Sequence, residues 1–500
     1  MLSALLAADW VAPKIDVHAL APEIILAAVV CLVLIADLFL PEHRKWITSP
    51  LAGLGLLLAF VPVITLAVDG TDRIMLGGGY VVDNFALVMK GIFLISGYVV
   101  VLLSSRYLDD GDYYQGEYWV LLLSAILGML MMSSSRDLIS IFVALEFLSI
   151  PAYMLAAWKK RDLKSNEAGL KYFLLGVFAS AVMLYGMSLL YGVTGTTLLT
   201  GISSSVADAG NTGLLALAVV FIIVGFAFKV SAVPFHSWAP DTYEGAPTPI
   251  TAFLSVGSKA AGFVGLLQLV LVAFPSAYEI WQPMFWGLSA LTMTVGNVVA
   301  LRQENVVRML AYSSIAQSGF ILMPLAVASR AGPEAVKAVV SYIAIYAAMN
   351  LGAFGVVLAV TRKTHRSDIA GFGGLFGYSP GLATAMTIFL ASLAGIPPTG
   401  GFFAKLSAFK AVISAGGGWG TALAAIGAVN SVIAFGYYSR LMKEMWMNPA
   451  PDGDTLPIKV PSNLVAALGL TVAATLLFGI MPGTVLRFGD LSGLLAGVAG

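Results

Sequence analysis

The sequence predicts an all-α membrane protein of about 14 transmembrane helices, in which two inverted five-helix repeats contain broken helices. Of the 500 residues, 59% are hydrophobic and only 11% are charged, and the mean hydropathy is +0.90. A water-soluble core does not absorb so much apolar surface. The apolar residues also fall into runs long enough to span a bilayer, and a few ionisable residues lie deep inside these runs.

Composition and motifs exclude several other classes of protein. The net charge is zero and the Lys and Arg residues are scattered, so no nucleic acid is expected as a partner. Cys31 is the only cysteine, which excludes an intramolecular disulfide and a multi-cysteine metal or iron–sulfur site. Four scattered histidines and the absence of nucleotide-binding motifs predict no metal and no cofactor in this chain.

Apolar runs of roughly 17–25 residues define the expected spans. They lie at 22–40, 50–68, 84–105, 118–134, 138–157, 168–192, 214–238, 248–274, 280–301, 306–329, 335–361, 382–416, 419–446 and 463–482. The run 382–416 would be about 50 Å long as one straight helix, against a hydrocarbon core of about 30 Å. It must therefore be broken, and the segment 397–401, PPTGG, supplies the break.

The distribution of Lys and Arg predicts the orientation. Alternate connections carry fifteen of these residues on one side and six on the other, and the richer side is expected to face the cytoplasm. An even number of spans then places both termini on the outer, periplasmic side of a bacterial inner membrane.

An internal repeat divides the chain further. Segments 118–274 and 280–446 each hold five spans with an interrupted run near the end, broken by Pro234 in the first and by Pro397-Pro398 in the second. Because five is odd, two such blocks in tandem have opposite orientations, an arrangement from which many transporters build a midplane site. Residues 1–117 form an N-terminal three-helix part, and residues 447–500 form a C-terminal helix and tail.

Four ionisable residues lie deep in these spans. Glu146 is about 12 Å into its span, Lys259 lies about 15 Å beyond Pro249, and Lys405 lies about 16 Å from the far end of its run, at the rise of an α-helix. Lys229 precedes Pro234, which frees polar backbone beside the lysine. Charges at such depth usually mark an ion pathway or a proton relay, so transport is the first hypothesis.

Glu146 and Lys229 are expected to form a switchable pair. A lysine removed from water gives up its proton more readily, and a neighbouring carboxylate opposes that loss. Loosening the pair would therefore release the proton. The alternative is a static pair that holds two helices together, but the surplus of lysines over mid-membrane acids is not explained by static pairing.

Other polar residues have weaker signals. Ser313 and Gln317 are one turn apart and could line a water file or bond neighbouring helices. His236, beside the break at Pro234, could relay protons or simply hydrogen-bond in a buried loop. Lys90 and Lys171 lie nearer to span ends, where snorkelling is typical. Lys410 is about 140° around the helix from Lys405, so the two do not face one cavity.

Three long motifs resemble the antiporter-like membrane subunits of respiratory complex I, the proton-pumping NADH:quinone oxidoreductase. They are PFHSWAPDTYEGAPTPITAFLSVGSKAAGF, RMLAYSSIAQSGF and LAGIPPTGGFFAKLSAF. The resemblance implies that Glu146 and Lys229 form the paired site of the first half-channel, that Lys259 links toward the second, and that Lys405 is its exit-side lysine. Gln317 departs from the family, because many relatives have a histidine there, and a glutamine carries no proton at neutral pH.

The resemblance also implies partners and a function. The chain would be a proton-translocating subunit beside other membrane subunits of the complex, with NADH, flavin, iron–sulfur clusters and quinone bound elsewhere. Two alternatives stay open: a subunit of a multisubunit cation/proton antiporter, which shares the fold, and a structural scaffold between active subunits.

Overall fold

The first third of the chain forms a helical layer with one small hairpin. The computed structural model describes residues 15–111, 116–210 and 212–489, so the far ends of the predicted N-terminal part and C-terminal tail lie outside the described residues. The elements up to residue 209 are α2 (Ala21–Phe39), η1 (Glu42–Ile47), α3 (Thr48–Asp69), β1 (Arg73–Met75), η2 (Leu76–Gly78), β2 (Tyr80–Val82), α4 (Asn84–Gly111), α5 (Gly116–Ser134), α6 (Leu138–Ala156), α7 (Leu163–Thr194) and α8 (Leu199–Ala209).

The middle of the chain holds the first broken helix and a continuous helix whose winding changes twice. Its elements are α9 (Gly213–Lys229), α10 (Trp238–Gly245), α11 (Thr248–Phe253), η3 (Leu254–Ser258), α12 (Lys259–Gln268), η4 (Leu269–Ala273), η5 (Pro275–Ala277), α13 (Tyr278–Ala300), α14 (Val306–Leu322), η6 (Leu325–Val327) and α15 (Ala328–Ala331). The run from α11 to η4 is one continuous helix in which η3 and η4 are wider π-helical segments.

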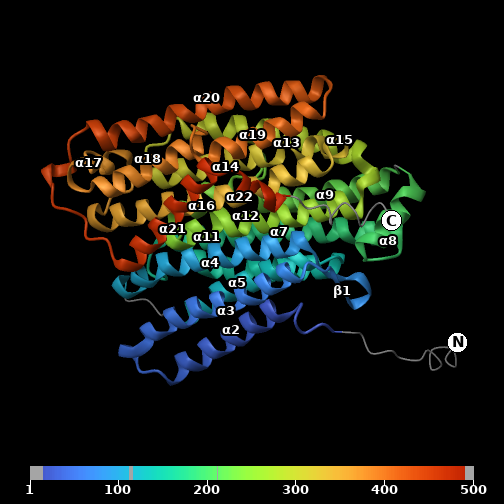
Figure 1. Cartoon of the computed structure of the whole chain (residues 1–500), viewed down its shortest axis with the longest axis horizontal. Helices are drawn as coiled ribbons and strands as arrows, with labels where there is room; N and C mark the ends of the chain where they lie inside the picture. The colour runs from blue at the N-terminus through green and yellow to red at the C-terminus, as the bar shows by residue number, and fades with distance from the viewer. Residues whose placement is uncertain (1–14, 112–115, 211, 490–500) are drawn as a thin grey trace.

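The last third contains the second broken helix and the long peripheral helix α20. Its elements are α16 (Pro333–Thr364), η7 (Ile369–Phe372), α17 (Leu375–Tyr378), α18 (Pro380–Ala394), α19 (Gly400–Ser414), α20 (Gly417–Met447), η8 (Pro451–Gly453), α21 (Ser462–Ile480), α22 (Gly483–Leu486) and η9 (Arg487–Gly489). Figure 1 shows the helices running side by side, with α2 at one edge, α20 at the other, and α12, α14 and α16 between them.

The fold is a predominantly helical membrane protein, as the sequence predicts. Among the described residues, eleven helices are long and apolar enough to cross a membrane, and three apolar helices are shorter. Each predicted span coincides with a helix or with an interrupted pair of helices. The sequence analysis did not predict the antiparallel hairpin β1–β2, in which Met75 pairs with Tyr80, or the short helices α8, α10 and α17 between the spans.

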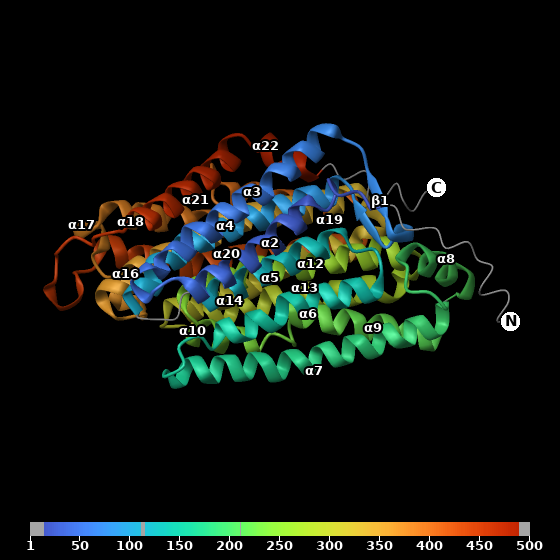
Figure 2. The ribbon, with the colours of Figure 1, turned by 90° about the horizontal axis from the view of Figure 1, so that it is seen from below.

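Burial separates a central group of helices from a peripheral one. The apolar windows of α11–η4 and α16 are 100% buried and that of α14 is 94% buried, whereas only 22% of the α2 window and 33% of the α7 window are buried. A helix that is apolar all round belongs in the interior of a bundle. In the turned view of Figure 2, α7 lies along one edge and α3 and α21 lie toward the opposite one.

The break in the predicted run 382–416 lies where the sequence predicts it. Helix α18 ends at Ala394, Gly395 caps it with a left-handed backbone (φ +90°), and α19 begins at Gly400. Gly401 allows the two halves to touch, because a Cβ there would lie 1.7 Å from the carbonyl oxygen of Ser392.

The break near Pro234 begins earlier than predicted. Helix α9 ends at Lys229, five residues before the proline. Ser231 takes a left-handed conformation (φ 58°), and its N–H and that of Ala232 bond back to the carbonyls of Phe228 and Ala227. This is the pattern that closes a helix C-terminus, usually with glycine. The predicted span 214–238 is therefore too long at its end.

Lys90 does not snorkel to a membrane surface. Its side chain is 0% exposed, and its Nζ lies 2.7 Å from Oε1 of Glu23 on α2. The hydroxyl of Tyr80 on β2 also donates to Glu23, at 2.8 Å. The span-end rule fails here because α2 and the hairpin cover this end of α4, and a buried charge needs a partner.

Candidate functional site

Lys229 reaches across to α6. As the last residue of α9 it is buried, and its Nζ donates to Oγ of Ser149 at 2.8 Å. Its Nζ also lies 5.8 Å from the ring centre of Tyr172 on α7. The early end of α9 directs the lysine to this place, because the chain turns away immediately after it.

Glu146 lies one turn before Ser149 on α6, but no ion pair joins it to Lys229. Its Oε1 accepts a hydrogen bond from Oγ of Ser180 at 2.5 Å. The expected direct pair is therefore absent from this conformation. Glu146 and Ser149 lie on the same side of α6, since residues three apart share a helix face, so Lys229 contacts this helix one turn away from Glu146.

Lys259 is placed where the central helix changes its winding. It directly follows the π-helical segment η3 and is 2% exposed. Its Nζ donates to Oγ of Ser314 on α14 at 2.6 Å and lies 5.8 Å from the ring centre of Tyr243. π-Helical turns are frequent at functional positions because they rotate the side chains that follow.

Helix α14 carries a polar stripe beyond Ser314. Ser313 hydrogen-bonds with the hydroxyl of Tyr438 on α20. Nε2 of Gln317 donates to the carbonyl of Leu393 at 3.0 Å, and its Oε1 accepts from the hydroxyl of Tyr342. The predicted spacing of Ser313 and Gln317 thus places both side chains in one buried hydrogen-bonded layer.

Lys405 closes the end of α18. Its Nζ donates to the carbonyl of Ala394 at 2.8 Å and lies 4.7 Å from the ring centre of Phe320. A cation suits the C-terminal end of a helix, where unpaired carbonyls and the helix dipole concentrate negative charge. Leu393, which accepts from Gln317, and Ala394 are adjacent, so α18 joins the α14 stripe to Lys405.

Lys229, Lys259 and Lys405 are called the lysine row below, and His236 does not contact it. It is half-buried in the connection between α9 and α10, and its ring centre lies 6.5 Å from that of Tyr312. Its Nδ1 is buried without a hydrogen-bond partner. The structure therefore gives the histidine no direct bond to Lys229 or Lys259.

Lys171 and Lys410 make ion pairs away from the row. Lys171 pairs with Asp241 and Glu167, both at 2.7 Å. Lys410 pairs with Glu334 at 3.2 Å and is largely exposed. The predicted separation of Lys410 from Lys405 is confirmed, because the two side chains meet different partners.

Acidic side chains of α10 form ion pairs with α7 and α14. Asp241 accepts from Lys171 of α7 at 2.7 Å and from Arg308 of α14 at 2.9 Å. Burial acts to raise the pKa of Asp241, but these two hydrogen bonds outweigh it, so the pKa lies below its ordinary value. The pKa of Glu244 is lowered in the same way by Arg308 and Lys164. Both carboxyls are held ionised beside the break.

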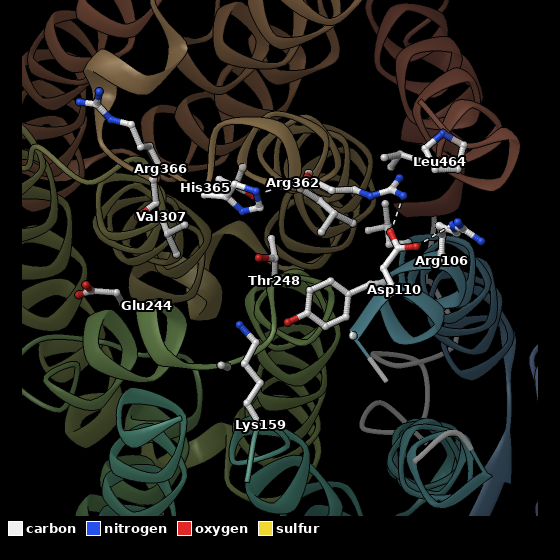
Figure 3. Close-up of a pocket in the computed structure, with 18 of the residues that line it drawn as sticks. Arg106, Asp110, Lys159, Glu244, Thr248, Val307, Arg362, His365, Arg366 and Leu464 are labelled. Carbon is white, nitrogen blue, oxygen red and sulfur yellow. Dashed lines mark hydrogen bonds and ion pairs between the residues drawn. The ribbon is translucent and has the colours of Figure 1, made fainter. Parts of the chain in front are cut away.

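A cavity of about 530 Å³ opens at the end of the bundle where the predicted Lys- and Arg-rich connections meet. Its wall is built from the ends of α4, α10 and α16, the starts of α11, α14 and α21, and the connection between α6 and α7. Figure 3 shows Lys159 extending into it from one side and His365 and Arg362 from the opposite side.

Sequence reasoning missed several of the residues that complete the row. Ser149, Ser180 and Tyr438 supply the hydroxyls that meet Lys229, Glu146 and Ser313. Only Ser149 had a signal, since it lies three residues from Glu146 on the same helix. The carbonyls of Leu393 and Ala394 had none, because any residue type presents a carbonyl.

These features define a polytopic membrane protein with a row of buried lysines at helix breaks. The family model for the transmembrane part of NADH:quinone oxidoreductase and the Mrp antiporter matches residues 135–433. The chain belongs to this family. The predicted family resemblance is thereby confirmed.

Individual relatives give a finer comparison. NADH-quinone oxidoreductase subunit N of Trichlorobacter lovleyi is 41% identical over 478 residues, which cover 95% of this chain and 96% of the relative. The opening run LAPEIILAAVVCLVLIADLF, the chain length and a lysine at 405 also predict a resemblance to subunit N, the counterpart of mitochondrial subunit 2. The relative confirms that resemblance.

Two solved structures share the fold. A chain of respiratory complex I from Thermus thermophilus with bound aureothin is 32% identical, with a TM-score of 0.76 over 93% of this chain and 98% of that one. A chain of the archaeal membrane-bound sulfane sulfur reductase, a respiratory membrane complex, is 25% identical, with a TM-score of 0.85 over 96% of this chain and 99% of that one.

Proposed function

We propose that this chain is a proton-translocating membrane subunit of an NADH–quinone oxidoreductase. The observation that carries the proposal is the buried row of Lys229, Lys259 and Lys405, each beside an interruption in a helix. The near-full-length relative named as subunit N supports the assignment to this oxidoreductase. In this role the chain contributes no redox group; NADH, flavin, iron–sulfur clusters and quinone are bound by other subunits.

The proposed path runs from Glu146 and Lys229 through Lys259 to Lys405. Two links within it are supported by contacts: Lys259 bonds to Ser314 on α14, and the stripe on α14 reaches the end of α18 through Gln317. Between Ser314 and Lys405 no side chain on this path carries a proton at neutral pH, so water must carry it past Gln317. Water in a buried polar site needs two to four partners, which this layer of hydroxyl, amide and carbonyl groups supplies.

The proposed switch is the pairing of Lys229 with Glu146, which are apart in this structure. In this conformation Lys229 bonds to Ser149, and Glu146 bonds to Ser180. We infer that a charge change at quinone reduction elsewhere draws Glu146 and Lys229 together or apart. Moving one proton against 100 mV costs about 2.3 kcal/mol, so modest changes in pairing are sufficient.

We infer fourteen crossings arranged as two inverted five-helix blocks. Supporting this, most of the connections assigned to the Lys- and Arg-rich side contribute to the wall of one cavity, although the connection that carries Arg44 and Lys45 does not. The hairpin, α8 and the turn before α6 meet at one other place, where Tyr80 bridges Ser135 and Asp137 bridges Leu198. These contacts support connections that lie alternately at two ends of the bundle, as successive crossings require. The cavity would face the cytoplasm of a bacterial cell.

The test replaces the paired residues in the assembled complex. Lys229→Ala and Glu146→Ala should each lower the number of protons moved per electron while the complex still assembles. Lys410→Ala is the matched control, because Lys410 is exposed and, within the described part of the chain, forms its ion pair with Glu334 alone. An undiminished proton-to-electron ratio in both variants would refute the proposed roles.

A subunit of a multisubunit cation/proton antiporter remains the second candidate, because the family description names both systems. Co-purification separates the two. Our proposal expects the chain to co-purify with NADH:quinone activity; sodium-dependent proton exchange in its place would favour the antiporter.

A further inference from the structure

The cavity in Figure 3 carries more positive than negative charge. Among the described residues, four cationic side chains line it, against two carboxylates, which leaves an excess of two positive charges before His365 is considered. Arg366 is paired with Asp368 outside the wall, as Glu244 is paired with cations outside it. The cations are Arg106, Lys159, Arg362 and Arg366, and the carboxylates are Asp110 and Glu244. None of these residues belongs to the lysine row.

The pairing of these groups sharpens the imbalance. Oδ1 of Asp110 accepts from Arg106 at 2.9 Å, and its Oδ2 is taken by Arg362, so one carboxylate is shared by two guanidinium groups. Glu244 does not compensate them, because it pairs with Arg308 at 2.8 Å and with Lys164 at 3.1 Å. The local charge beside Arg106 and Arg362 is therefore positive.

Lys159 is the least satisfied of the cations. No carboxylate among the described residues pairs with it, and its Nζ lies 5.7 Å from the ring centre of Tyr107. Figure 3 shows its side chain directed into the cavity, toward the side from which Arg362 and His365 come. A long cationic side chain held over a ring and aimed into a cavity lacks an anion.

The chemistry of the wall selects the kind of anion. Each guanidinium group has five N–H donors in a planar fork, and Asp110 leaves several of them unused. Arginine forks together with a lysine point charge are the usual means by which proteins hold phosphate oxygens. One part of the wall is apolar, with Leu102, Leu103, Leu358 and Leu464, which suits the ester-linked carbon of a phosphate ester.

We propose that this cavity binds a phosphate ester or phosphate ion, held by Lys159, Arg106 and Arg362. Its volume of about 530 Å³ lies within the roughly 300–1,000 Å³ of small-molecule sites. It lies where membrane helices end, at the level at which phospholipid headgroups and dissolved phosphate are both available. The inference does not depend on proton translocation.

The experiment uses the assembled complex that contains this chain, stripped of lipid in detergent. Lys159→Gln removes a charge that has no ion-pair partner, and Arg362→Gln removes one that shares Asp110. Arg161→Gln is the control, since this exposed arginine lies in the same connection as Lys159 but outside the cavity wall. Native mass spectrometry then counts the phosphatidylglycerol retained after incubation with vesicles of phosphatidylcholine that contain it.

We expect the wild type and the Arg161 variant to retain phosphatidylglycerol, with binding about tenfold weaker in each cavity variant. Phosphorus NMR with inorganic phosphate, in phosphatidylcholine alone, distinguishes the source. Binding of inorganic phosphate that is lost in the cavity variants assigns a site for free phosphate, and retention of the lipid alone assigns a headgroup site. Equal binding of both probes by the wild type and Lys159→Gln, whose assembly is checked by gel filtration, would overturn the proposal.

Discussion

Each lysine of the row rests on a neutral oxygen rather than on a carboxylate. Lys229 and Lys259 contact serine hydroxyls, and Lys405 contacts a backbone carbonyl. A neutral amine keeps two N–H donors, so all three contacts can persist after loss of the proton. The difference lies in the lone pair that the proton leaves behind. A serine hydroxyl can turn to donate to that lone pair, although the hydroxyl of Ser149 now donates to the carbonyl of Leu145, whereas the carbonyl of Ala394 only accepts.

Substitutions of Gln317 test whether the proposed proton path needs a titratable group at this position. Gln317→Leu leaves the hydroxyl of Tyr342 and the carbonyl of Leu393 without their partner, at a cost of about 1–3 kcal/mol for each buried group. We expect this variant to pump fewer protons per electron. Gln317→His can still donate to one group and accept from the other, so we expect pumping to stay close to that of the wild type.

The measurement is the proton-to-electron ratio of the complex in sealed vesicles. If Gln317→Leu pumps as well as the wild type, the layer around Gln317 does not carry the protons. A large gain with histidine would instead show that water alone limits transfer at this point.

Among elements, the two broken helices are built by different local chemistry. The sequence of segment 397–401 predicts its break, since the prolines end one helix. The glycines then begin the next helix, α19, in close contact with α18. The break after Lys229 depends on Ser231 in a left-handed conformation, for which serine gives no sequence signal. The sequence therefore predicts the first break at Pro234, whereas α9 already ends at Lys229.

Gly401 sets the distance between the two halves of the second broken helix. A Cβ at this position would lie 1.7 Å from the carbonyl oxygen of Ser392, so Gly401→Ala must push α19 away from α18. We expect the contact between Lys405 and Ala394 to weaken, with lower thermal stability and less pumping.

Gly418→Ala on α20 is the control for this substitution. No atom lies within 4 Å of a Cβ there, and alanine is favoured over glycine within a helix by about 0.5–1 kcal/mol. The comparison is made by the thermal midpoint of the assembled complex and by its proton-to-electron ratio. Equal behaviour of the two variants would mean that the close approach of α18 and α19 does not position Lys405.

At the scale of the whole molecule, the sequence predicts membrane helices better than it predicts their neighbours. Glu146, Lys229, Lys259 and Lys405 were found from depth within apolar runs, which is a property of single helices. Depth within a run does not give the partners of a residue. Lys90, for example, lies near the end of a span, which predicts a place at the membrane surface, but α2 and β2 cover it. Which helix covers which span end depends on packing between distant segments, and one sequence holds no direct record of it.

The orientation of the whole bundle gives the last prediction. Asp16 pairs with Arg73 of the hairpin, and Gly489 packs against Lys337 near the start of α16, so both described ends lie on connections poor in Lys and Arg. From the positive-inside rule we then expect both termini to lie outside. A cytoplasmic reporter fused at Gly500 should be inactive and alkaline phosphatase active there, whereas reporters in the connection 448–461 should behave oppositely. Cytoplasmic activity both at Gly500 and in the connection 448–461 would contradict a crossing by α21, and cytoplasmic activity at Gly500 with none in that connection would reverse the orientation of the bundle.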